Sequence, residues 1–586
     1  MADLKGNPFF LSEERAAWVE STLAHMSTDE KIGQLFCPVG FGSDDATLDF
    51  MIGECRIGGM MYRTGQMKDI QETYRKIQSR ARIPLLLAAN TESGGNGIVA
   101  EGTSFGKPMA VAATGDPENA YRMGYTACAE GAAVGMNWSF APIIDIDYNF
   151  HNPITNVRTF GSDPETVLSF AREYLRGADE AGVAVAIKHF PGDGTDERDQ
   201  HILTSVNSLA ADEWMRTYGH VYSELIRAGA KSVMVGHIAQ PALVSMVRPD
   251  ASYEERMLPG SLSKELITGV LREKLGFNGV ISTDSSAMVG YLCAMPREKA
   301  VPASIEAGCD IVLFNKDLAE DITFMKKGLE NGLLSEKRLN EAVERVLALK
   351  ASLGLIERQA AGTLVPGEEA LAQIGTAEHR AWSREVADRA VTLVKDTQQL
   401  LPISSARYPR VYLNVIERKR ESRSAYALAW KELFEKEGFA VTLRDRSVTI
   451  EMENFMGMNM TPAKAALMDE LYRPVEKFKD STDLYVYVAN IENASNNTTA
   501  RLDWNVIFGL GDDAPWFVQE KPALFISTAN PYHLFDAPML KTFINAYDGS
   551  AIFREAVMDK IMGRSAFKGV SPVDVTCGCP YISTEV

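Results

Sequence analysis

The stretch that decides the fold reads Val183-Ala-Val-Ala-Ile-Lys-His-Phe-Pro-Gly-Asp-Gly-Thr-Asp-Glu-Arg-Asp-Gln-His201. Its five leading apolar residues predict a buried strand, which ends in Lys188 and His189 before a Pro/Gly turn. The turn then delivers Asp199 and His201 as an Asp-x-His pair. Charged groups at the end of a buried strand are costly unless they line a site, so a candidate site is expected here.

Similar apolar runs recur through the first 355 residues and alternate with helical patterns. The predicted strands are Gln34–Pro38, Gly59–Tyr62, Leu85–Asn90, Trp138–Ile144, Ala184–His189, Ser232–His237, Val280–Asp284 and Asp310–Phe314. The clearest helical patterns between them are Met67–Arg80, Asp163–Glu180 and Ser263–Leu275. Eight strands alternating with helices predict an α/β fold of the (β/α)₈ barrel type, and continuous apolar strands fit a parallel sheet buried on both faces. A doubly wound sheet is the alternative, but no Gly-x-Gly-x-x-Gly opens a helix after a strand.

The chain is too long for one ordinary domain, so two are expected. The barrel is predicted over residues 1–357, where the helix Glu336–Leu353 closes the pattern. A Gly-, Pro- and Ala-rich linker is predicted at 358–378 and a second α/β domain at 379–586. The elements predicted in the second domain are strands Arg410–Val415, Leu484–Val488 and Ala523–Ser527 and helices Ala381–Val391 and Ser424–Glu437.

Six of the eight predicted barrel strands end in polar residues that could carry chemistry. In chain order these are Asn90, Asp145, Lys188 with His189, His237, Asp284 and Asn315. In a barrel of parallel strands, all carboxyl ends face one mouth, which is where active sites lie. A single polar strand end is usually a cap or a turn former, whereas six of eight indicate a functional mouth.

Composition excludes several classes of partner. The formal net charge of −18 disfavours nucleic acid and anionic membrane surfaces. The first residues lack the apolar core of a signal peptide, and no apolar run approaches the roughly 20 residues of a membrane span, so a cytoplasmic enzyme is expected. Seven cysteines suit free buried thiols, because the Cys577-x-Cys579 pair lacks the matching second pair of a zinc site.

Four ordered motifs resemble glycoside hydrolase family 3, in its β-N-acetylglucosaminidase branch. They are Lys-His-Phe-Pro-Gly at 188–192 with the Asp-x-His loop, Asn-Pro at 152–153 with Arg-Thr-Phe-Gly at 158–161, the strand Gly276-Phe-Asn-Gly-Val-Ile-Ser-Thr-Asp284, and Ser383-Arg-Glu-Val-Ala-Asp-Arg-Ala with Leu-Leu-Pro at 400–402. The opening Met26-Ser-Thr-Asp-Glu-Lys-Ile-Gly-Gln is also similar to the family's first helix. The resemblance implies a catalytic barrel followed by an αβα-sandwich domain.

The resemblance also implies roles for individual residues. Asp284 would be the nucleophile, although the same position could merely cap a helix. His201 would be the acid/base, oriented by Asp199. The residues implied to bind the sugar are Lys188, His189 and Arg158, with Asn90 or Glu92 in place of the family's hydroxyl-binding carboxylate, while His237 is equally well a buried core histidine. No metal and no cofactor is expected, because the reaction has its own nucleophile.

Three departures from the family pattern bear on specificity. Asp193 stands where the glucosaminidase branch usually has His, as in the β-glucosidase branch. Gln200 stands between Asp199 and His201 where Ser or Thr is usual. The family's Asp-Gln-Glu-Gly-Gly segment reads Asn90-Thr-Glu-Ser-Gly-Gly.

These features predict a retaining exo-β-glycosidase acting on β-linked glucosides or N-acetylglucosaminides through a glycosyl-aspartate. The acceptor stays open between water and inorganic phosphate, with phosphate slightly favoured because a neutral imidazole does not repel an anion. Rival predictions are a plain hydrolase, a catalytically silent sugar-binding protein, and an aldolase-like barrel with Lys188 as Schiff-base former. The aglycone and the oligomeric state are not encoded in any pattern that we recognise.

Overall fold

The computed structural model describes residues 2–419, 421, 423–446, 456–493, 495–496, 501–502, 504 and 513–586. The chain forms two compact units. Unit 1 consists of the chain up to Pro108, of Asp116–Ser383 and, among the described residues, of Ser495 and Asn496. Unit 2 consists of the described residues of Met109–Gly115 and of the remainder after Ser383. No helix within the described part of the chain is both long and apolar enough to cross a membrane.

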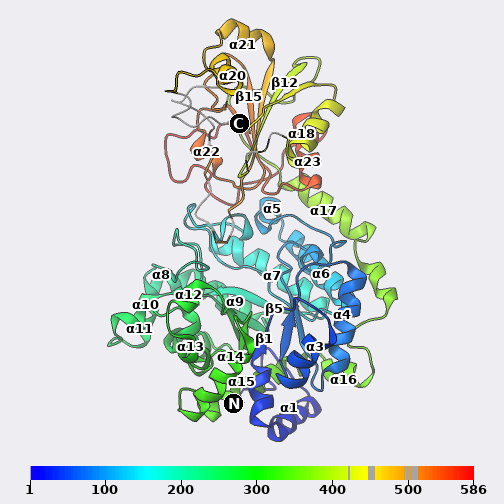
Figure 1. Ribbon diagram of the computed structural model, residues 1–586, viewed down its shortest axis with the longest axis vertical. Coiled ribbons are helices and arrows are strands. Elements are labelled where there is room, and N and C mark those ends of the chain that lie inside the picture. Colours follow the sequence, from blue (N-terminus) through cyan, green and yellow to red (C-terminus); the bar gives the residue numbers. More distant parts are fainter. Residues whose placement is uncertain are drawn as a thin grey trace. The chain divides into compact units, whose positions relative to one another are not determined.

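Unit 1 is a barrel of eight parallel strands surrounded by helices (Figure 1). The strands are β1 (Phe36–Cys37), β2 (Gly59–Met61), β3 (Leu86–Ala89), β4 (Trp138–Ser139), β5 (Ala184–Phe190), β7 (Ser232–Val235), β9 (Val280–Ser285) and β10 (Ile311–Leu313). Their order in the sheet is β1-β10-β9-β7-β5-β4-β3-β2. Backbone hydrogen bonds close the ring between the first and last strands, from Met61 N to the Pro38 oxygen (3.0 Å) and from Gly40 N to the Met61 oxygen (2.8 Å). All eight predicted strands are present, and the barrel prediction is confirmed.

The strands form because most of them begin with apolar residues and are buried on both sides. Every residue of β5 is buried, including Lys188 and His189 at its end, and so are the first five residues of β9. A run that stays apolar for its whole length has no face to offer to water, which suits a parallel barrel inside a ring of helices. The charged residues at the carboxyl ends of these strands therefore lie together at one end of the barrel.

The helices of unit 1 start and stop at recognisable signals. They include α1 (Glu13–His25), α2 (Thr28–Gln34), α4 (Met67–Arg80), α6 (Glu118–Val134), α7 (Pro164–Glu180), α9 (Tyr218–Arg227), α10 (Pro241–Val247), the π-type helix Glu265–Lys274, α12 (Val289–Leu292), α13 (Arg297–Ala307), α14 (Leu318–Glu330), α15 (Glu336–Ser352) and α16 (Leu355–Ala360). Asp163 caps α7 by accepting from Thr166 N, with Pro164 in the first turn. Helix α4 has the bounds that its apolar spacing predicts.

A small two-stranded sheet lies next to the main one and holds the end of the long loop after β5. Strand β6 (Ser205–Val206) pairs in parallel with β8 (Ile238–Ala239), just beyond β7. We call residues 191–204, between β5 and β6, the His201 loop. Both of its ends are thus fixed to strands, which limits how far its centre can move.

Unit 2 contains a six-stranded sheet in the order β11-β16-β15-β14-β12-β13. Its strands are β11 (Thr392–Asp396), β12 (Arg410–Glu417), β13 (Ala440–Leu443), β14 (Leu484–Asn490), β15 (Ala523–Ser527) and β16 (Thr542–Asn545), all parallel except β11 against β16. Its helices include α17 (Ala377–Ala390, which begins in unit 1), α18 (Ala425–Lys436), α20 (Pro462–Leu471), α21 (Val475–Ser481), α22 (His533–Asp536) and α23 (Ala551–Ile561). An aromatic core with Phe478, Tyr485 and Phe517 packs on the sheet. The predicted αβα-sandwich is confirmed.

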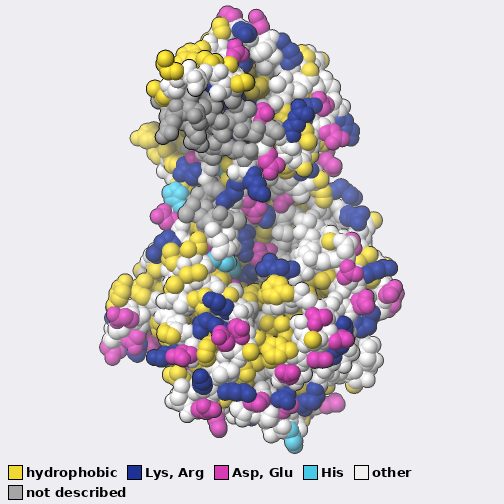
Figure 2. Space-filling model, viewed as in Figure 1, with side chains coloured by type: hydrophobic (Ala, Val, Ile, Leu, Met, Phe, Trp, Pro, Cys, Tyr) yellow, Lys and Arg dark blue, Asp and Glu magenta, His cyan; other side chains and the backbone are white. Residues whose placement is uncertain are grey.

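The surface carries the charge imbalance of the sequence without separating the two signs. On the face shown in Figure 2, acidic and basic side chains are interspersed with apolar ones over the barrel helices. The acidic excess of −18 is therefore a property of the whole sequence rather than of one patch on this face.

Candidate active site

A cavity of about 680 Å³ lies at the carboxyl ends of the barrel strands in unit 1. Seven of the nine predicted site residues line it, namely Asn90, Glu92, Arg158, Lys188, His189, His201 and Asp284. The other two predicted residues, Asp199 and His237, are buried behind its wall. A cavity of this size is in the range that encloses a small organic ligand.

One side of the cavity is a cluster of one carboxylate and two cations. Glu92 lies 2.7 Å from Lys188 Nζ and accepts two hydrogen bonds from Arg158, at 3.1 Å from Nε and 2.9 Å from Nη2. Burial raises the pKa of Glu92, but the neighbouring Arg158 and Lys188 outweigh it and hold that pKa well below the usual range. Asn90, by contrast, is exposed to the cavity, and its Oδ1 is 3.4 Å from Lys188 Nζ. Of the two candidate hydroxyl binders, Asn90 is the one with spare hydrogen-bonding capacity.

Asp284 ends β9 at the floor of the cavity. Its Oδ1 accepts a hydrogen bond from Ser285 N (2.6 Å), and its Oδ2 lies 3.9 Å from His189 Nε2. Burial raises the pKa of Asp284, but His189, His237 and His201 together bring it below the usual value. The carboxylate is therefore ionised at neutral pH and held rigidly by the end of its strand.

His189 is fixed by a carboxyl group that sequence patterns marked only as a strand end. Asp145 is fully buried and accepts from the His189 backbone N (3.0 Å) and from His189 Nδ1 (2.6 Å). Because a carboxylate only accepts, the Nδ1 proton points to Asp145 and the opposite ring nitrogen faces Asp284. Asp145 thus orients His189 toward the floor of the cavity.

His201 and Asp199 form a second pair of imidazole and carboxylate. Asp199 accepts from His201 N (2.8 Å) and from His201 Nδ1 (2.7 Å), and its second oxygen accepts from Asn496 N (2.5 Å), which belongs to the same unit. Asp199 is 3% exposed. Burial raises the pKa of Asp199, but its bonds with His201 lower it overall. The ring is therefore held at Nδ1, which leaves Nε2 to exchange a proton.

His237 is fully buried and has both ring nitrogens engaged. Its Nε2 lies 2.9 Å from the Ser285 oxygen, and its Nδ1 lies 2.8 Å from Ser261 Oγ. Because a carbonyl only accepts, Nε2 carries the proton and Nδ1 accepts from the serine. Burial lowers the pKa of His237. The residue braces the strand of Asp284 from behind rather than reaching the cavity.

Sequence reasoning missed several residues of the cavity wall. Phe41, Arg63 and Lys316 line it and follow β1, β2 and β10, three neighbouring strands of the ring. Each comes a few residues after a predicted strand, so the rule that loops after strands form the mouth could have found them. Phe41 is 86% exposed, so it stands at the rim rather than in the floor.

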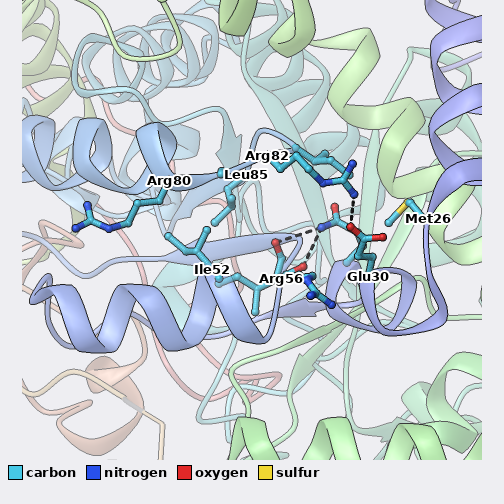
Figure 3. Close-up of a pocket in the computed structure, with 12 residues that line it drawn as sticks. Met26, Glu30, Ile52, Arg56, Arg80, Arg82 and Leu85 are labelled. Atoms are coloured by element: carbon cyan, nitrogen blue, oxygen red, sulfur yellow. Dashed lines mark hydrogen bonds and ion pairs between the residues drawn. The ribbon is translucent and has the colours of Figure 1, made fainter.

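A second cavity, of about 340 Å³, lies at the opposite end of the barrel, lined by residues that precede β1 to β3. In Figure 3, Arg82 and Glu30 point toward each other and Arg80 points away from them. Glu30 pairs with Arg82 and also accepts from Ser27 N (2.8 Å), which caps α2. Charges neutralised within the wall at this end of a barrel serve stability, so the candidate active site is the mouth.

Comparison with known proteins agrees with this geometry. Residues 27–349 match the glycosyl hydrolase family 3 N-terminal domain. The chain is 40% identical over 580 residues, 99% of both proteins, to a β-N-acetylglucosaminidase/β-glucosidase of Cellulomonas fimi. It is 44% identical to a solved β-glucoside phosphorylase, BglX, with a TM-score of 0.89 over 98% of this chain and 99% of that one.

A β-N-acetylglucosaminidase structure from Paenibacillus sp. str. FPU-7 shares the fold at 24% identity, with a TM-score of 0.75 over 94% of this chain and 99% of that one. The family match and the Cellulomonas fimi relative identify the chain as a glycosidase-type enzyme. The chain belongs to glycoside hydrolase family 3, as its motifs indicate.

Proposed function

We propose that this protein cleaves β-glucosides, and β-N-acetylglucosaminides to some extent, through a covalent intermediate on Asp284, and that inorganic phosphate is its favoured acceptor. The observation that carries the proposal is the position of Asp284 and the Asp199–His201 pair on one cavity with the Glu92, Arg158 and Lys188 cluster. The Cellulomonas fimi relative is named for both glycosides, and the BglX relative for β-glucoside phosphorolysis.

In the first step, Asp284 attacks the anomeric carbon of the bound sugar. The bond from that carbon to the aglycone oxygen breaks as the bond to Asp284 forms, and His201 Nε2 gives its proton to the departing oxygen. Asp199 stabilises the imidazole in this role through its hydrogen bond to Nδ1. The low pKa of Asp284 keeps the nucleophile ionised at neutral pH.

The cluster opposite Asp284 binds the sugar hydroxyls. Lys188 and Arg158 donate charge-assisted hydrogen bonds, and Glu92 holds both cations in place. Asn90 can both donate and accept, which suits a hydroxyl group. His189 presents Nε2 beside Asp284, where it contacts the hydroxyl next to the reacting carbon.

The second step decides between hydrolysis and phosphorolysis. Once His201 has given up its proton, the acceptor meets a neutral ring, and the Asp199 carboxylate lies behind that ring. A carboxylate acid/base at about 4 Å would repel phosphate by roughly 4 kcal/mol at an effective dielectric near 20, or about three orders of magnitude in rate. Arg63 and Lys316 on the wall add positive charge. A cytoplasmic setting, which the acidic sequence favours, would supply phosphate.

The test is turnover of aryl β-glucoside and aryl β-N-acetylglucosaminide, each with and without phosphate, followed by phosphorus NMR. Two inversions at the anomeric carbon give the β-anomer of the sugar 1-phosphate. Phosphate should also accelerate substrates limited by release from Asp284. Free sugar with unchanged phosphate would identify a plain hydrolase. A 2-fluoro glycoside that labels a residue other than Asp284 would refute the nucleophile assignment.

A further inference from the structure

The His201 loop has a buried anchor next to its catalytic residue. Gln200 is fully buried, although its neighbour His201 lines the cavity. Its Nε2 donates to Asp193 Oδ2 (3.2 Å), and its Oε1 accepts from His237 N (2.7 Å). A buried amide is costly unless both ends are hydrogen-bonded, and here both are. The side chain therefore ties the part of the loop around His201 to two fixed points, one at the start of the same loop and one just after β7.

The first fixed point is Asp193, which is 2% exposed and meets only donors. Its Oδ1 accepts from Asn152 Nδ2 (2.7 Å) and Gly194 N (2.8 Å), and its Oδ2 accepts from Gln200. The Asp193 backbone N donates to Asp145 Oδ1 (2.8 Å), so Asp193 is fixed to the carboxyl group that orients His189. Through Asp193 and Asp145, Gln200 is thus connected to His189 at the floor of the cavity.

The second fixed point is His237. Its ring donates from Nε2 to the Ser285 oxygen, directly after Asp284. The loop makes two further contacts on the same side, because Val289 N donates to the His201 backbone oxygen (3.0 Å) and the Thr204 side chain donates from Oγ1 to the Gly290 oxygen (2.9 Å). The loop is thus docked on the segment that follows the nucleophile strand.

We propose that Asp193 and Gln200 form a latch that sets the distance between His201 and Asp284 by holding the His201 loop docked. They act as positioning residues, because neither lines the cavity. The latch rests on the proposed function in one respect, namely that His201 is the acid/base. The latch also explains why this chain carries Asp at 193 and Gln at 200. Asp193 supplies an acceptor, and the amide of Gln200 supplies both a donor and an acceptor.

The donors and acceptors of the latch can be exchanged between positions 193 and 200, which allows a direct test. His237 N can only donate and Asp193 can only accept, so the amide of Gln200 fits in one orientation. Asp193→Asn places two NH₂ groups against each other, and Gln200→Glu places two carboxylates against each other. In the double variant, the new amide at position 193 would donate to the new carboxylate at position 200, whose second oxygen would accept from His237 N. The double variant therefore restores the latch with its donor and acceptor exchanged.

The assay compares an alkyl β-glucoside with a dinitrophenyl β-glucoside at about pH 8. Burial and the nearby Asp145 raise the pKa of Asp193 to about 7, so the wild-type carboxylate is ionised at that pH. Each single variant should lose roughly 10- to 100-fold in kcat/KM on the alkyl glycoside. The loss on the dinitrophenyl glycoside should be less than about three-fold, because that leaving group needs no proton. The double variant should recover most of the alkyl activity.

Amide hydrogen exchange supplies a readout that does not depend on chemistry. Exchange in the His201 loop should be faster in each single variant and slow again in the double variant. The matched control is Gln78→Ala, because Gln78 is also buried and also makes two hydrogen bonds, to Leu85 O and Leu85 N (both 3.0 Å), far from the mouth. It should leave the leaving-group dependence and the loop exchange unchanged.

The outcomes separate the latch from the proposed function. A double variant no better than the worse single one, or loop exchange that stays slow in the single variants, would overturn the latch. The latch would also be overturned if the control Gln78→Ala showed the same dependence on the leaving group. His201→Ala is measured alongside. Equal losses on both glycosides in that variant would overturn the acid/base role, while the exchange data still decide whether the loop is latched.

Discussion

Glu92→Gln tests whether Glu92 holds Lys188 and Arg158 in place while Asn90 binds the sugar hydroxyls. The change keeps the shape of the side chain and removes its charge. Glu92 contacts Lys188 Nζ at 2.7 Å and Arg158 Nη2 at 2.9 Å, and the side chain of Lys188 is only 4% exposed. Without the carboxylate, two cations face each other across a neutral amide. The sequence left Asn90 and Glu92 as equal candidates for binding hydroxyls, so the comparison of the two decides the question.

The contact distances give the size of the effect. At an effective dielectric of about 20, each contact contributes roughly 6 kcal/mol of attraction before desolvation is subtracted. The desolvation of the three ions offsets much of that total, and removal of one partner from a buried pair typically costs about 3–5 kcal/mol. We therefore expect Glu92→Gln to lower both the Tm of the barrel and kcat/KM. A loss of about 4 kcal/mol in transition-state binding is about a thousand-fold.

The matched variant is Asn90→Ala, measured on a nitrophenyl β-glucoside with a thermal melt of each protein. Asn90 is open to the cavity and makes one long contact, so its loss should cost about 0.5–1.5 kcal/mol in binding and leave the Tm unchanged. The expected pattern is a stability defect in Glu92→Gln alone and a loss of kcat/KM in both. An unchanged Tm in Glu92→Gln together with a large loss of kcat/KM, and no kinetic loss in Asn90→Ala, would make Glu92 the hydroxyl binder and refute this division.

Three further variants test other parts of the barrel. His189 is the largest of the influences that lower the pKa of Asp284 against its burial, so His189→Gln should move the acid limb of kcat/KM for an activated aryl glycoside to higher pH; an unmoved limb would assign it to another group. Burial lowers the pKa of Lys350 to about 7, so the native state binds fewer protons than the unfolded chain above that pH. The wild-type Tm should therefore gain between about pH 7 and pH 9, and Lys350→Met should lose that gain; identical pH profiles would contradict it. A Cβ added at Gly290 would lie 2.4 Å from the backbone oxygen of Gln200. Gly290→Ala should therefore displace the His201 loop and slow the turnover of alkyl glycosides far more than that of dinitrophenyl glycosides; equal effects on both would contradict it.

The sequence was sufficient for the barrel because most of its strands begin with a short run of apolar residues. Runs such as Ala184–Ile187 end abruptly in charged or amide side chains, so both the strand and its end could be predicted. Strands β11, β13 and β16 of unit 2 were not predicted. β13 alternates between exposed and half-buried residues at the edge of the sheet, and β16 has only four residues. Such strands exist because a neighbouring strand pairs with them, and a single sequence does not show that partner.

The site could be predicted as a set of residues but not as an arrangement. Asp145 and His237 stand at strand ends like Lys188, yet the structure turns both into the wall and leaves Lys188 in the cavity. Which way a side chain leaves a strand end depends on the tilt of that strand, which the sequence does not encode. Asp193 and Gln200 were visible as departures from the family pattern, but nothing in the sequence joins them.

The structure also offers an argument for the nucleophile that is independent of any motif. Of the five carboxyl groups described above at this mouth, four accept side-chain hydrogen bonds: Glu92 from Arg158 and Lys188, Asp145 from His189, Asp193 from Asn152 and Gln200, and Asp199 from His201. Among these five, Asp284 alone accepts only a backbone N–H in the part of the chain that is described, and His189 stands 3.9 Å away.

A carboxylate whose lone pairs are taken by hydrogen-bond donors is stabilised as an ion and has little to gain from a new bond to carbon. Asp284 keeps an unoccupied oxygen, a low pKa and a rigid position at the end of β9. A covalent nucleophile needs this combination, because it must be ionised without being neutralised. The partners of the other four carboxyl groups thus support the proposal that Asp284 is the one that bonds to the sugar.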